Sequence, residues 1–420
     1  MDKFIITGGH PLSGTLRIGG SKNGSLPLMA AALLTKGVTT LTDVPHLMDV
    51  RTMSNVLRVI GAKVFGKGKV FKIDTTHCDH FEAPYDLVKT MRASFYVLGP
   101  LLARYHRARV SLPGGCAWGP RPVDLHLRGL EALGATINTD AGYVEAISKG
   151  RLSGGSFEFD KVSVGATANL IMAAVLAKGK SRLINTAKEP EVTGLILFLR
   201  KMGAKIKEIK EGVEITGVPE LKPVRMKVIP DRIEAGTFLS AVCLSGGKVR
   251  LENCPVSDMA SAIDTFQKTG MTIRTDRHSL TAEAPKHIRP LEISTSPYPG
   301  FPTDLQAQLM AVLSRADGVS ILTDTVYHDR FTHVPELNRL GAQISLQNNT
   351  AVIRGVSSLS GAPVMATDLR ASAALVAAGL SAKGKTEISR VYHIDRGYER
   401  IEIKLGALGA QIERIKDKSM

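Results

Sequence analysis

Two kinds of side chain are scarce in this sequence, and each shortage excludes classes of protein. Aromatic residues make up 5% of the 420 residues, with one tryptophan, and no RNP-like box is present. There are four cysteines, at positions 78, 116, 243 and 254, and they share neither a metal-ligand nor a disulfide spacing. We therefore expect reduced thiols in a cytoplasmic protein, without a structural metal or a disulfide framework.

Long apolar segments and targeting signals are also missing. No run of about eighteen apolar residues is free of charge, so no segment is expected to span a membrane. The opening M-D-K-F-I-I-T lacks the basic and then apolar pattern of a secretory leader. A length of 420 residues exceeds one ordinary hydrophobic core, which favours two domains.

Positive charge is in excess, since 54 Lys and Arg oppose 39 Asp and Glu for a net charge of +15. Such a surplus suits either nucleic acid or anionic small molecules. The basic residues are scattered and aromatics are few, which disfavours nucleic acid but leaves it as an alternative. The glycine pairs at 8–9 and 19–20 lack the spacing of a phosphate-binding or dinucleotide loop, so those folds are excluded.

One structural signature recurs six times along the chain. The end of a helix, a glycine and a strand return with a period of about 70 residues, as in E-A-L-G-A-T-I and N-R-L-G-A-Q-I. Glycine in this place is typical of a left-handed helix C-cap. The glycines for which we predict that conformation are Gly61, Gly134, Gly203, Gly270, Gly341 and Gly409.

An Ala-rich apolar helix precedes each signature by about half a period. A helix that is apolar on nearly every side must be buried on nearly every side, and one 70-residue unit cannot bury it alone. We therefore predict two domains of three units each, with the Pro-rich, charged segment 217–230 as a candidate hinge. The predicted buried helices cover residues 26–34, 93–102, 168–176, 236–244, 305–313 and 371–380.

Charged residues occupy the starts of these helices. Lys22, Arg92 and Arg370 lie there, with Glu234 and Asp304 at equivalent places in other repeats. Helix starts present free N–H groups to anions, so parallel helices would gather these side chains into a basic cleft for a phosphate or carboxylate. Solvated surface charges, or residues that merely cap helices, are the alternative.

A cysteine lies in a loop that reads S-L-P-G-G-C-A-W-G-P-R. Pro113 ends a short strand, and Gly114 and Gly115 leave the backbone free to move or to approach a ligand. Arg121 lies five residues after Cys116, and a nearby guanidinium lowers the pKa of a thiol. The loop indicates either a reactive thiol or a small buried hydrophobe.

Long words of the sequence match a known family nearly end to end. They include S-K-N-G-S-L-P from residue 21, S-L-P-G-G-C from 111, R-P-V-D-L-H from 121, F-P-T-D-L-Q-A-Q from 301, M-A-T-D-L-R-A-S from 365 and Y-H-I-D-R-G-Y-E-R-I-E from 392. With these words the chain closely resembles the UDP-N-acetylglucosamine 1-carboxyvinyltransferases, enolpyruvyl transferases of the first committed step of bacterial peptidoglycan synthesis. The shikimate-pathway transferases share the fold but lack the cysteine loop, so they are the runner-up.

The resemblance implies an α/β fold of two inside-out domains, as in EPSP synthase. Each domain has three pseudo-symmetric repeats, with buried helices and outer sheets. One domain would span 23–229 and carry the Cys116 loop, and the other would combine 1–22 with 230–420. The active site is expected between them, and the domains are expected to close when the sugar nucleotide binds.

The resemblance also implies the reaction. The enolpyruvyl group of phosphoenolpyruvate moves to the 3-hydroxyl of UDP-N-acetylglucosamine, and phosphate is released, without a metal or organic cofactor. An acid near the methylene carbon and a base near the hydroxyl are required. The expected role is cell-wall biogenesis, and through it cell shape and division, with neither nucleic acid nor a membrane as partner.

Motif matches carry the family's roles to particular residues. Cys116 would be the acid and could form a covalent adduct with phosphoenolpyruvate, Asp304 would be the base, and Asn23 would orient the hydroxyl. Trp118 and Pro120 depart from the family, which leaves the mobility of the loop open. The cations expected on phosphoenolpyruvate are Lys22, Arg121 and Arg396 near its phosphate, with Arg330 and Arg370 near its carboxylate. The residues expected on the sugar nucleotide are Arg92, Arg121, Pro122, Val123, Asp124, Leu125, Lys161, Val162, Ser163, Val164, Asp304 and Val326.

Overall fold

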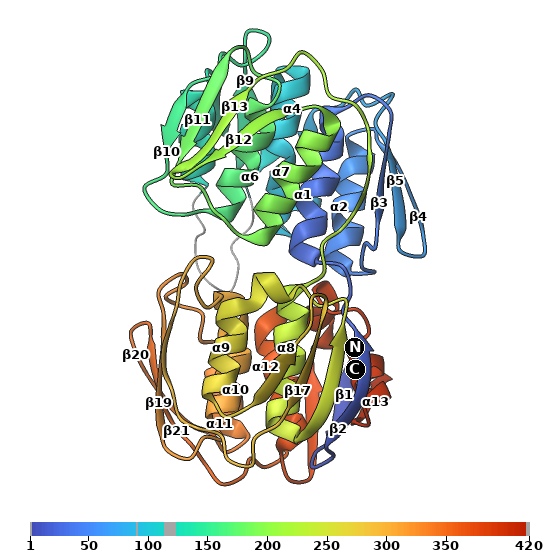
Figure 1. The fold of residues 1–420 in the computed structure, drawn as a ribbon. Coiled ribbons are helices and arrows are strands. Elements are labelled where there is room, and N and C mark those ends of the chain that lie inside the picture. The colour runs from blue at the N-terminus through green and yellow to red at the C-terminus, as the bar shows by residue number, and fades with distance from the viewer. Residues whose placement is uncertain (1, 90, 113–122, 417–420) are drawn as a thin grey trace. The chain divides into compact units, whose positions relative to one another are not determined.

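The computed structural model describes residues 2–89, 91–112 and 123–416, which divide into two compact units (Figure 1). We call residues 20–229 the continuous unit and residues 1–19 with 230–420 the split unit. The chain therefore crosses between the units twice. Segment 217–230, expected as a hinge, includes strand β14 (Arg225–Lys227), which pairs with β3 (Val38–Thr42), so most of it is part of the continuous unit.

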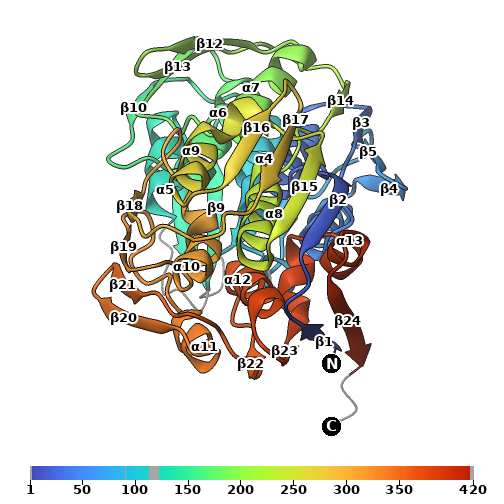
Figure 2. The ribbon, with the colours of Figure 1, turned by 60° about the horizontal axis from the view of Figure 1, so that its bottom comes forward.

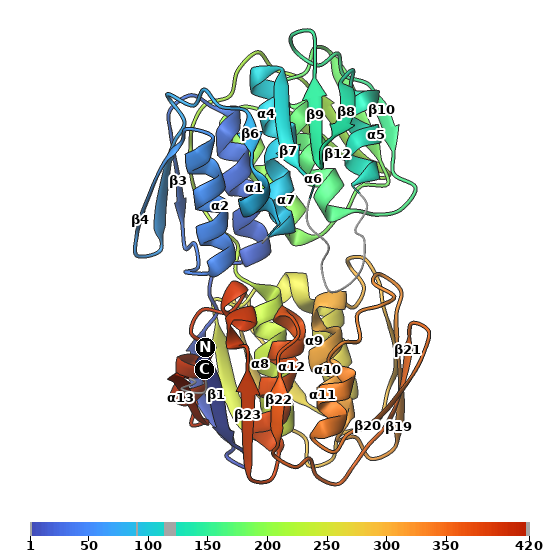
Figure 3. The same cartoon turned by 180° about the vertical axis from the view of Figure 1, so that it is seen from behind.

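Each unit is built around helices that are buried on all sides. In the split unit, α12 (Leu369–Ser381) buries every residue from Leu369 to Leu380, and α10 (Gln306–Leu313) buries its whole length. Helix α8 (Arg232–Ser245) packs against both of them. Figure 3 shows these helices with the sheets outside them. The predicted arrangement of buried helices and outer sheets is therefore confirmed.

Short 3-10 segments extend several of the buried helices, and a second, partly buried helix in each repeat packs beside them. The other helices of the continuous unit are α1 (Lys22–Ala31), η1 (Ala32–Leu34), α2 (Met48–Val59), α3 (Tyr85–Val88), η2 (Arg92–Val97), α4 (Leu98–Tyr105), α5 (Asp124–Ala132), α6 (Val164–Ala174) and α7 (Pro190–Met202). Those of the split unit are η3 (Val256–Met259), α9 (Ala260–Lys268), η4 (Thr303–Leu305), α11 (Val334–Arg339), η5 (Val391–Arg396) and α13 (Ile401–Ala407). No helix in the described residues is both long enough and apolar enough to cross a bilayer.

The strands of the described residues form six four-stranded sheets with one plan, in which a parallel edge strand is followed by three antiparallel neighbours. The sheets of the continuous unit are, in spatial order, β14, β3, β5 (Val70–Asp74) and β4 (Lys63–Lys67); β6 (Glu82–Ala83), β7 (Arg107–Ser111), β9 (Tyr143–Ile147) and β8 (Thr136–Asp140); and β10 (Ser156–Glu158), β11 (Lys180–Ile184), β13 (Gly212–Thr216) and β12 (Lys205–Ile209). Those of the split unit are β16 (Thr272–Thr275), β17 (Ser279–Glu283), β15 (Gly247–Glu252) and β2 (Leu12–Arg17); β18 (Glu292–Thr295), β19 (Val319–Asp324), β21 (Thr350–Arg354) and β20 (Gln343–Gln347); and β22 (Pro363–Met365), β23 (Lys385–Ser389), β1 (Asp2–Thr7) and β24 (Gln411–Lys416).

The edge strand of each sheet comes from the preceding repeat. Strands β6 and β10 each extend the sheet of the repeat that follows them, and β14 returns to the first sheet of its unit. In the split unit β2 pairs with β15, and β1 lies between β23 and β24 (Figure 2). The three repeats of each unit therefore exchange strands in a closed cycle, and residues 2–17 complete two sheets of the split unit.

The six signature glycines all adopt the left-handed conformation, with φ between 92° and 109°. Gly203, for example, is the C-cap of α7, and its N–H reaches the carbonyl oxygens of Leu199 and Arg200. Strand β12 begins two residues later. The prediction of a left-handed turn at these six positions is confirmed, and the turn leads each second helix directly into its strand.

Candidate active site

The carboxylate of Asp304 lies between two guanidinium groups in the split unit. Its Oδ1 is 2.8 Å from Nη1 of Arg330, and its Oδ2 is 2.6 Å from Nη2 of Arg370. Asp304 belongs to η4, Arg370 is the second residue of α12, and Arg330 precedes α11. The fold thus brings together three residues that the sequence predicted as parts of one site.

Both arginines of this cluster are more buried than the acid. The exposed fraction of the side chain is 24% for Asp304, 10% for Arg330 and 6% for Arg370. Burial is the largest single effect on the pKa of Arg370 and lowers it, but the negative charge and hydrogen bond of Asp304, together with Tyr398 and Asp231, outweigh burial, so the net shift is upward. One carboxylate thus faces two cations, and the cluster of three side chains has a net positive charge that suits an anion.

A fully buried carboxylate holds the Arg330 side of the cluster. Nη1 of Arg330 donates to Thr303 Oγ1 at 3.1 Å, and that hydroxyl donates to Asp324 Oδ2 at 2.7 Å. Asp324 Oδ1 also accepts the backbone N–H groups of Val326 and Tyr327, at 3.0 and 2.8 Å. Val326, predicted to meet the sugar nucleotide, therefore lies in a turn that the same carboxylate fixes.

Arg396 is the last residue of η5, which packs against α12. Burial, and after it the charge of Arg396, lowers the pKa of His393 on the same element. Asp368 caps α12 by accepting the N–H groups of Arg370 and Ala371, at 2.8 and 3.2 Å. This cap fixes the backbone from which the Arg370 side chain extends.

In the continuous unit, Lys22 and Asn23 are the first two residues of α1, after the N-cap Ser21. Nζ of Lys22 lies 3.4 Å from Oδ2 of Asp49 in the first turn of α2. Both side chains are largely buried, with 13% of Lys22 and 5% of Asp49 exposed. The lysine is therefore held in place by a neighbouring helix.

Apart from Asp304 and Val326, the described residues predicted for the sugar nucleotide lie at three helix starts of the continuous unit. Arg92 begins η2, Val123 precedes α5, and Ser163 caps α6 by accepting the N–H of Ala166 at 3.3 Å. The other residues of this set are Asp124 and Leu125, which begin α5, Lys161 and Val162, which precede Ser163, and Val164, which begins α6. Helix α6 contacts both η2 and α5.

Asn169 of α6 connects three neighbouring helices, η2, α4 and α5, through contacts of its side-chain amide. Its Oδ1 accepts the N–H of Gly99 at 2.6 Å, and its Nδ2 donates to the carbonyl oxygen of Phe95 at 2.9 Å. Nδ2 is also 3.0 Å from Nδ1 of His126, which must therefore accept, so the ring carries its proton on Nε2. Burial, and after it the charge of Arg92, lowers the pKa of His126 to about 3, so the ring is neutral.

Cys116, Arg121 and Pro122 lie outside the described residues. Sequence reasoning missed Asp324 and Asn169, which are fully buried and support the site. A polar side chain inside an otherwise apolar helix was the available signal for Asn169. Within residues 2–89, 91–112 and 123–416, no three His, Cys, Asp or Glu side chains are placed to hold a metal ion.

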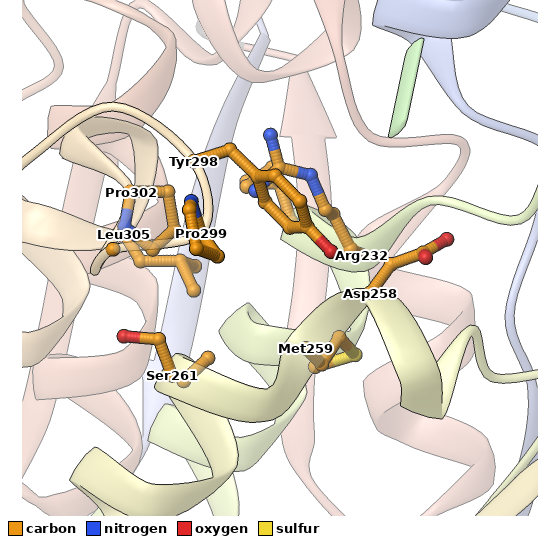
Figure 4. Close-up of a pocket in the computed structure, with 11 residues that line it drawn as sticks. Arg232, Asp258, Met259, Ser261, Tyr298, Pro299, Pro302 and Leu305 are labelled. Atoms are coloured by element: carbon orange, nitrogen blue, oxygen red, sulfur yellow. The ribbon is translucent and has the colours of Figure 1, made fainter. Parts of the chain in front are cut away.

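A small pocket lies next to η4 in the split unit (Figure 4). Its lining includes Arg232, Asp258, Tyr298 and Leu305, and the guanidinium of Arg232 lies 5.6 Å from the centre of the Tyr298 ring. Its empty space, solvent at the mouth included, is about 250 Å³, which is less than a ligand the size of a sugar nucleotide needs. None of the predicted site residues that the structure describes lines this pocket.

Comparisons with known proteins identify the family to which this chain belongs. The family model of EPSP synthase (3-phosphoshikimate 1-carboxyvinyltransferase) matches residues 6–405, so the chain belongs to this family of enolpyruvyl transferases. Within the family, the UDP-N-acetylglucosamine 1-carboxyvinyltransferase of Chloroherpeton thalassium is 52% identical over 99% of this chain and 97% of its own length. The protein of that name from Geobacter metallireducens is 51% identical over 99% of this chain and its entire own length, 100%.

Solved structures support the same class. The enolpyruvyl transferase NikO from Streptomyces tendae has a TM-score of 0.90 and 26% identity, over 99% of both chains. EPSP synthase from Acinetobacter baumannii has a TM-score of 0.78 with 18% identity, over 99% of this chain and 100% of its own, and shares the fold.

Proposed function

We propose that the protein transfers the enolpyruvyl group of phosphoenolpyruvate to the 3-hydroxyl of UDP-N-acetylglucosamine and releases phosphate. The relatives that share about half of its residues carry the name of this activity. The structural observation that carries the proposal is the Asp304 carboxylate held between Arg330 and Arg370. A base beside two buried cations suits a neutral hydroxyl that must attack an anionic enol ether.

The reaction has two stages. An acid adds a proton to the methylene carbon of phosphoenolpyruvate while the sugar oxygen bonds to the neighbouring carbon and a base takes its proton. The product is a tetrahedral ketal that still carries phosphate. Loss of a proton from the new methyl group restores the double bond, and the carbon–oxygen bond to phosphate breaks. Each stage needs one acid and one base in reach of the same carbon centre.

Asp304 is the proposed base, and the structure suggests how substrate binding would prepare it. Both of its oxygens face guanidinium groups, so neither has its lone pairs fully available for a proton. The carboxylate of phosphoenolpyruvate would compete for Arg330 and Arg370 and release one oxygen of Asp304 toward the sugar hydroxyl. Binding of one substrate would therefore activate the other.

The remaining roles follow the family resemblance. Cys116 is the proposed acid, and Arg121 would stabilise the thiolate that is left after the thiol has given its proton. Lys22, Arg121 and Arg396 would bind the phosphate group, and Asn23 would orient the hydroxyl. Because Lys22 and Asp304 belong to different units, the proposal requires residues of both. We propose that these units act as the two domains of the enzyme.

The residues of the continuous unit that are assigned to the sugar nucleotide would meet its diphosphate at the starts of η2, α5 and α6. Such starts combine unpaired backbone N–H groups with the positive end of the helix dipole. Arg92 adds a full charge at the first of them.

We propose cytoplasmic peptidoglycan synthesis as the setting, with cell shape and division depending on the product.

The test is release of inorganic phosphate from phosphoenolpyruvate with each acceptor in turn. We expect release with UDP-N-acetylglucosamine and none with shikimate 3-phosphate or without an acceptor. Release with shikimate 3-phosphate alone would favour the shikimate-pathway reaction. No release with either, together with steeply salt-dependent binding of DNA or RNA, would favour the nucleic-acid alternative.

A further inference from the structure

Three buried polar side chains form hydrogen bonds with one another, and Arg370 joins them through Tyr398. Tyr398 follows η5, Thr237 belongs to α8 and Gln308 to α10, and their exposed fractions are 2%, 3% and 0%. Nη1 of Arg370 lies 3.1 Å from the Tyr398 hydroxyl, which lies 2.7 Å from Thr237 Oγ1. These contacts join the guanidinium to the centre of the helix bundle.

Hydrogen bonds run from Arg370 through Tyr398 and Thr237 to the carbonyl oxygen of Ile233, and the two ends of this series determine which atom donates in each bond. A guanidinium can only donate, so Tyr398 Oη accepts from Arg370. At the other end, Thr237 Oγ1 donates to the carbonyl oxygen of Ile233 at 2.9 Å. The Tyr398 hydroxyl must therefore donate to Thr237, and it can do so only while it is protonated. Burial raises the pKa of Tyr398 and keeps it protonated at neutral pH.

Gln308 connects these hydrogen bonds to Asp304, the proposed base. Its Nε2 lies 3.2 Å from the Tyr398 hydroxyl and 3.1 Å from the backbone carbonyl oxygen of Asp304. The Gln308 amide therefore contacts both the Tyr398 hydroxyl, which binds Arg370, and the backbone of Asp304, whose carboxylate pairs with Arg370. Removal of the Tyr398 hydroxyl leaves buried donors on Arg370 and Gln308 with one acceptor fewer.

We propose that Tyr398 is a positioning residue that fixes the guanidinium group of Arg370 for the carboxylate of phosphoenolpyruvate. This inference rests on the proposed function. When the substrate competes with Asp304 for Nη2, Nη1 stays bound to Tyr398, so the guanidinium keeps its plane and need not reorganise. A cation whose position is set before the substrate arrives binds and stabilises it at lower entropic cost.

The first measurement is the steady-state kinetics of Tyr398→Phe, which keeps the ring and removes the hydroxyl. We expect kcat/KM for phosphoenolpyruvate to fall about 10-fold, mainly through KM, because a hydrogen bond to a charged group is lost. At saturating phosphoenolpyruvate, KM for the sugar nucleotide should stay within about twofold of wild type. An unchanged KM for phosphoenolpyruvate would overturn the proposal.

Tyr105→Phe is the matched control. Tyr105 lies in the continuous unit, and its hydroxyl donates to the carbonyl oxygen of Cys78 at 3.1 Å. The variant loses one tyrosine hydroxyl bond, as Tyr398→Phe does, without touching Arg370. We expect both KM values to be unchanged in this control, and an equal KM rise in both variants would mean that the effect is general destabilisation.

A double-mutant cycle separates positioning from packing. If Tyr398 acts through Arg370, Tyr398→Phe should change KM less than twofold in an Arg370→Lys background, because lysine lacks the planar fork that Tyr398 holds. Additive effects would overturn the proposal. If Tyr398→Phe does not fold, Thr237→Val breaks the next bond of the chain and should raise KM in the same direction. Wild-type phosphate release is the reference, since its absence would reject the proposed function itself.

Discussion

Asp304 combines two tasks that conflict in the free protein. It balances the charges of Arg330 and Arg370, and in the proposed reaction it must also take a proton. A carboxylate that faces two cations is a poor base until one of them is drawn to another anion. In the proposed reaction, phosphoenolpyruvate would therefore have to draw one arginine away before Asp304 could take the proton of the sugar hydroxyl.

The first prediction concerns this side chain. Asp304→Asn keeps the shape but removes the charge, so we expect kcat to fall about 100-fold or more, while the sugar nucleotide still binds. The two arginines lose their counter-charge, so the free energy of unfolding should fall by about 1–3 kcal/mol. Phosphate release and chemical denaturation measure the two effects. Asp317→Asn, which alters an exposed pair with His287, is the control, and normal turnover in Asp304→Asn would point to another base.

The second prediction concerns the proposed acid, which the sequence alone indicates. Cys116→Ser should lose phosphate release at neutral pH and still bind UDP-N-acetylglucosamine, because a hydroxyl is a much weaker acid than a thiol. Cys116→Asp should keep activity and resist epoxide-type alkylating agents. Full activity of the serine variant would remove Cys116 from the acid role.

The third prediction is a loss of stability in acid. The pKa of His126 is lowered to about 3 and that of His333 to about 4, in both cases mainly by burial. The unfolded chain binds these protons near pH 6.5, so the stabilisation is complete above that pH and decreases as the pH falls toward 4. At pH 5 the loss for His126 is on the order of 2 kcal/mol.

Chemical denaturation at pH 7.5 and pH 5 tests this loss. His126→Gln retains an oxygen that can accept from Asn169 but cannot be protonated in this range. The variant should therefore lose less stability between the two pH values than wild type. Equal losses in wild type and His126→Gln would contradict the prediction.

At the scale of elements, the apolar helices and the glycine turns could be predicted because each depends on its own residues. A helix such as α12 has no polar face, which predicts that it is buried, and a glycine after a helix predicts a left-handed turn. Strand exchange carries no such local signal, since β14 has three residues and its partner β3 lies far along the chain. The same holds for Tyr398, whose partners Thr237 and Gln308 belong to other repeats.

The fourth prediction compares two glycines with the same free space. A Cβ added at Gly203 or at Gly406 would meet no atom within 4 Å, but only Gly203 has a positive φ, of 109°. Gly203→Ala should therefore lower the free energy of unfolding by about 1–2 kcal/mol through backbone strain alone. Gly406→Ala, within α13, should raise it by about 0.5–1 kcal/mol. Thermal or chemical unfolding decides, and an equal effect at both positions would contradict the prediction.

At the scale of the whole molecule, the two units differ in how they are closed. The continuous unit contains every strand of its own three sheets, whereas the split unit takes β1 and β2 from the start of the chain. The fifth prediction is that residues 20–229 fold cooperatively as a separate chain. Residues 230–420 alone should not fold, because they lack the strand between β23 and β24 and the partner of β15. Circular dichroism and denaturant titration of the two fragments test this, with addition of a peptide of residues 1–19 as the rescue.

The cyclic exchange of edge strands also fixes the size of each unit. An open solenoid grows by adding repeats at its ends and needs special capping repeats to finish. Here the third repeat returns its strand to the first, as β14 does to β3, so there is no terminus at which another copy could be appended. Insertion of a further repeat would have to open this closed cycle of exchanged strands. Such a chain can therefore evolve through changes in its loops and side chains, but not through a change in the number of its repeats.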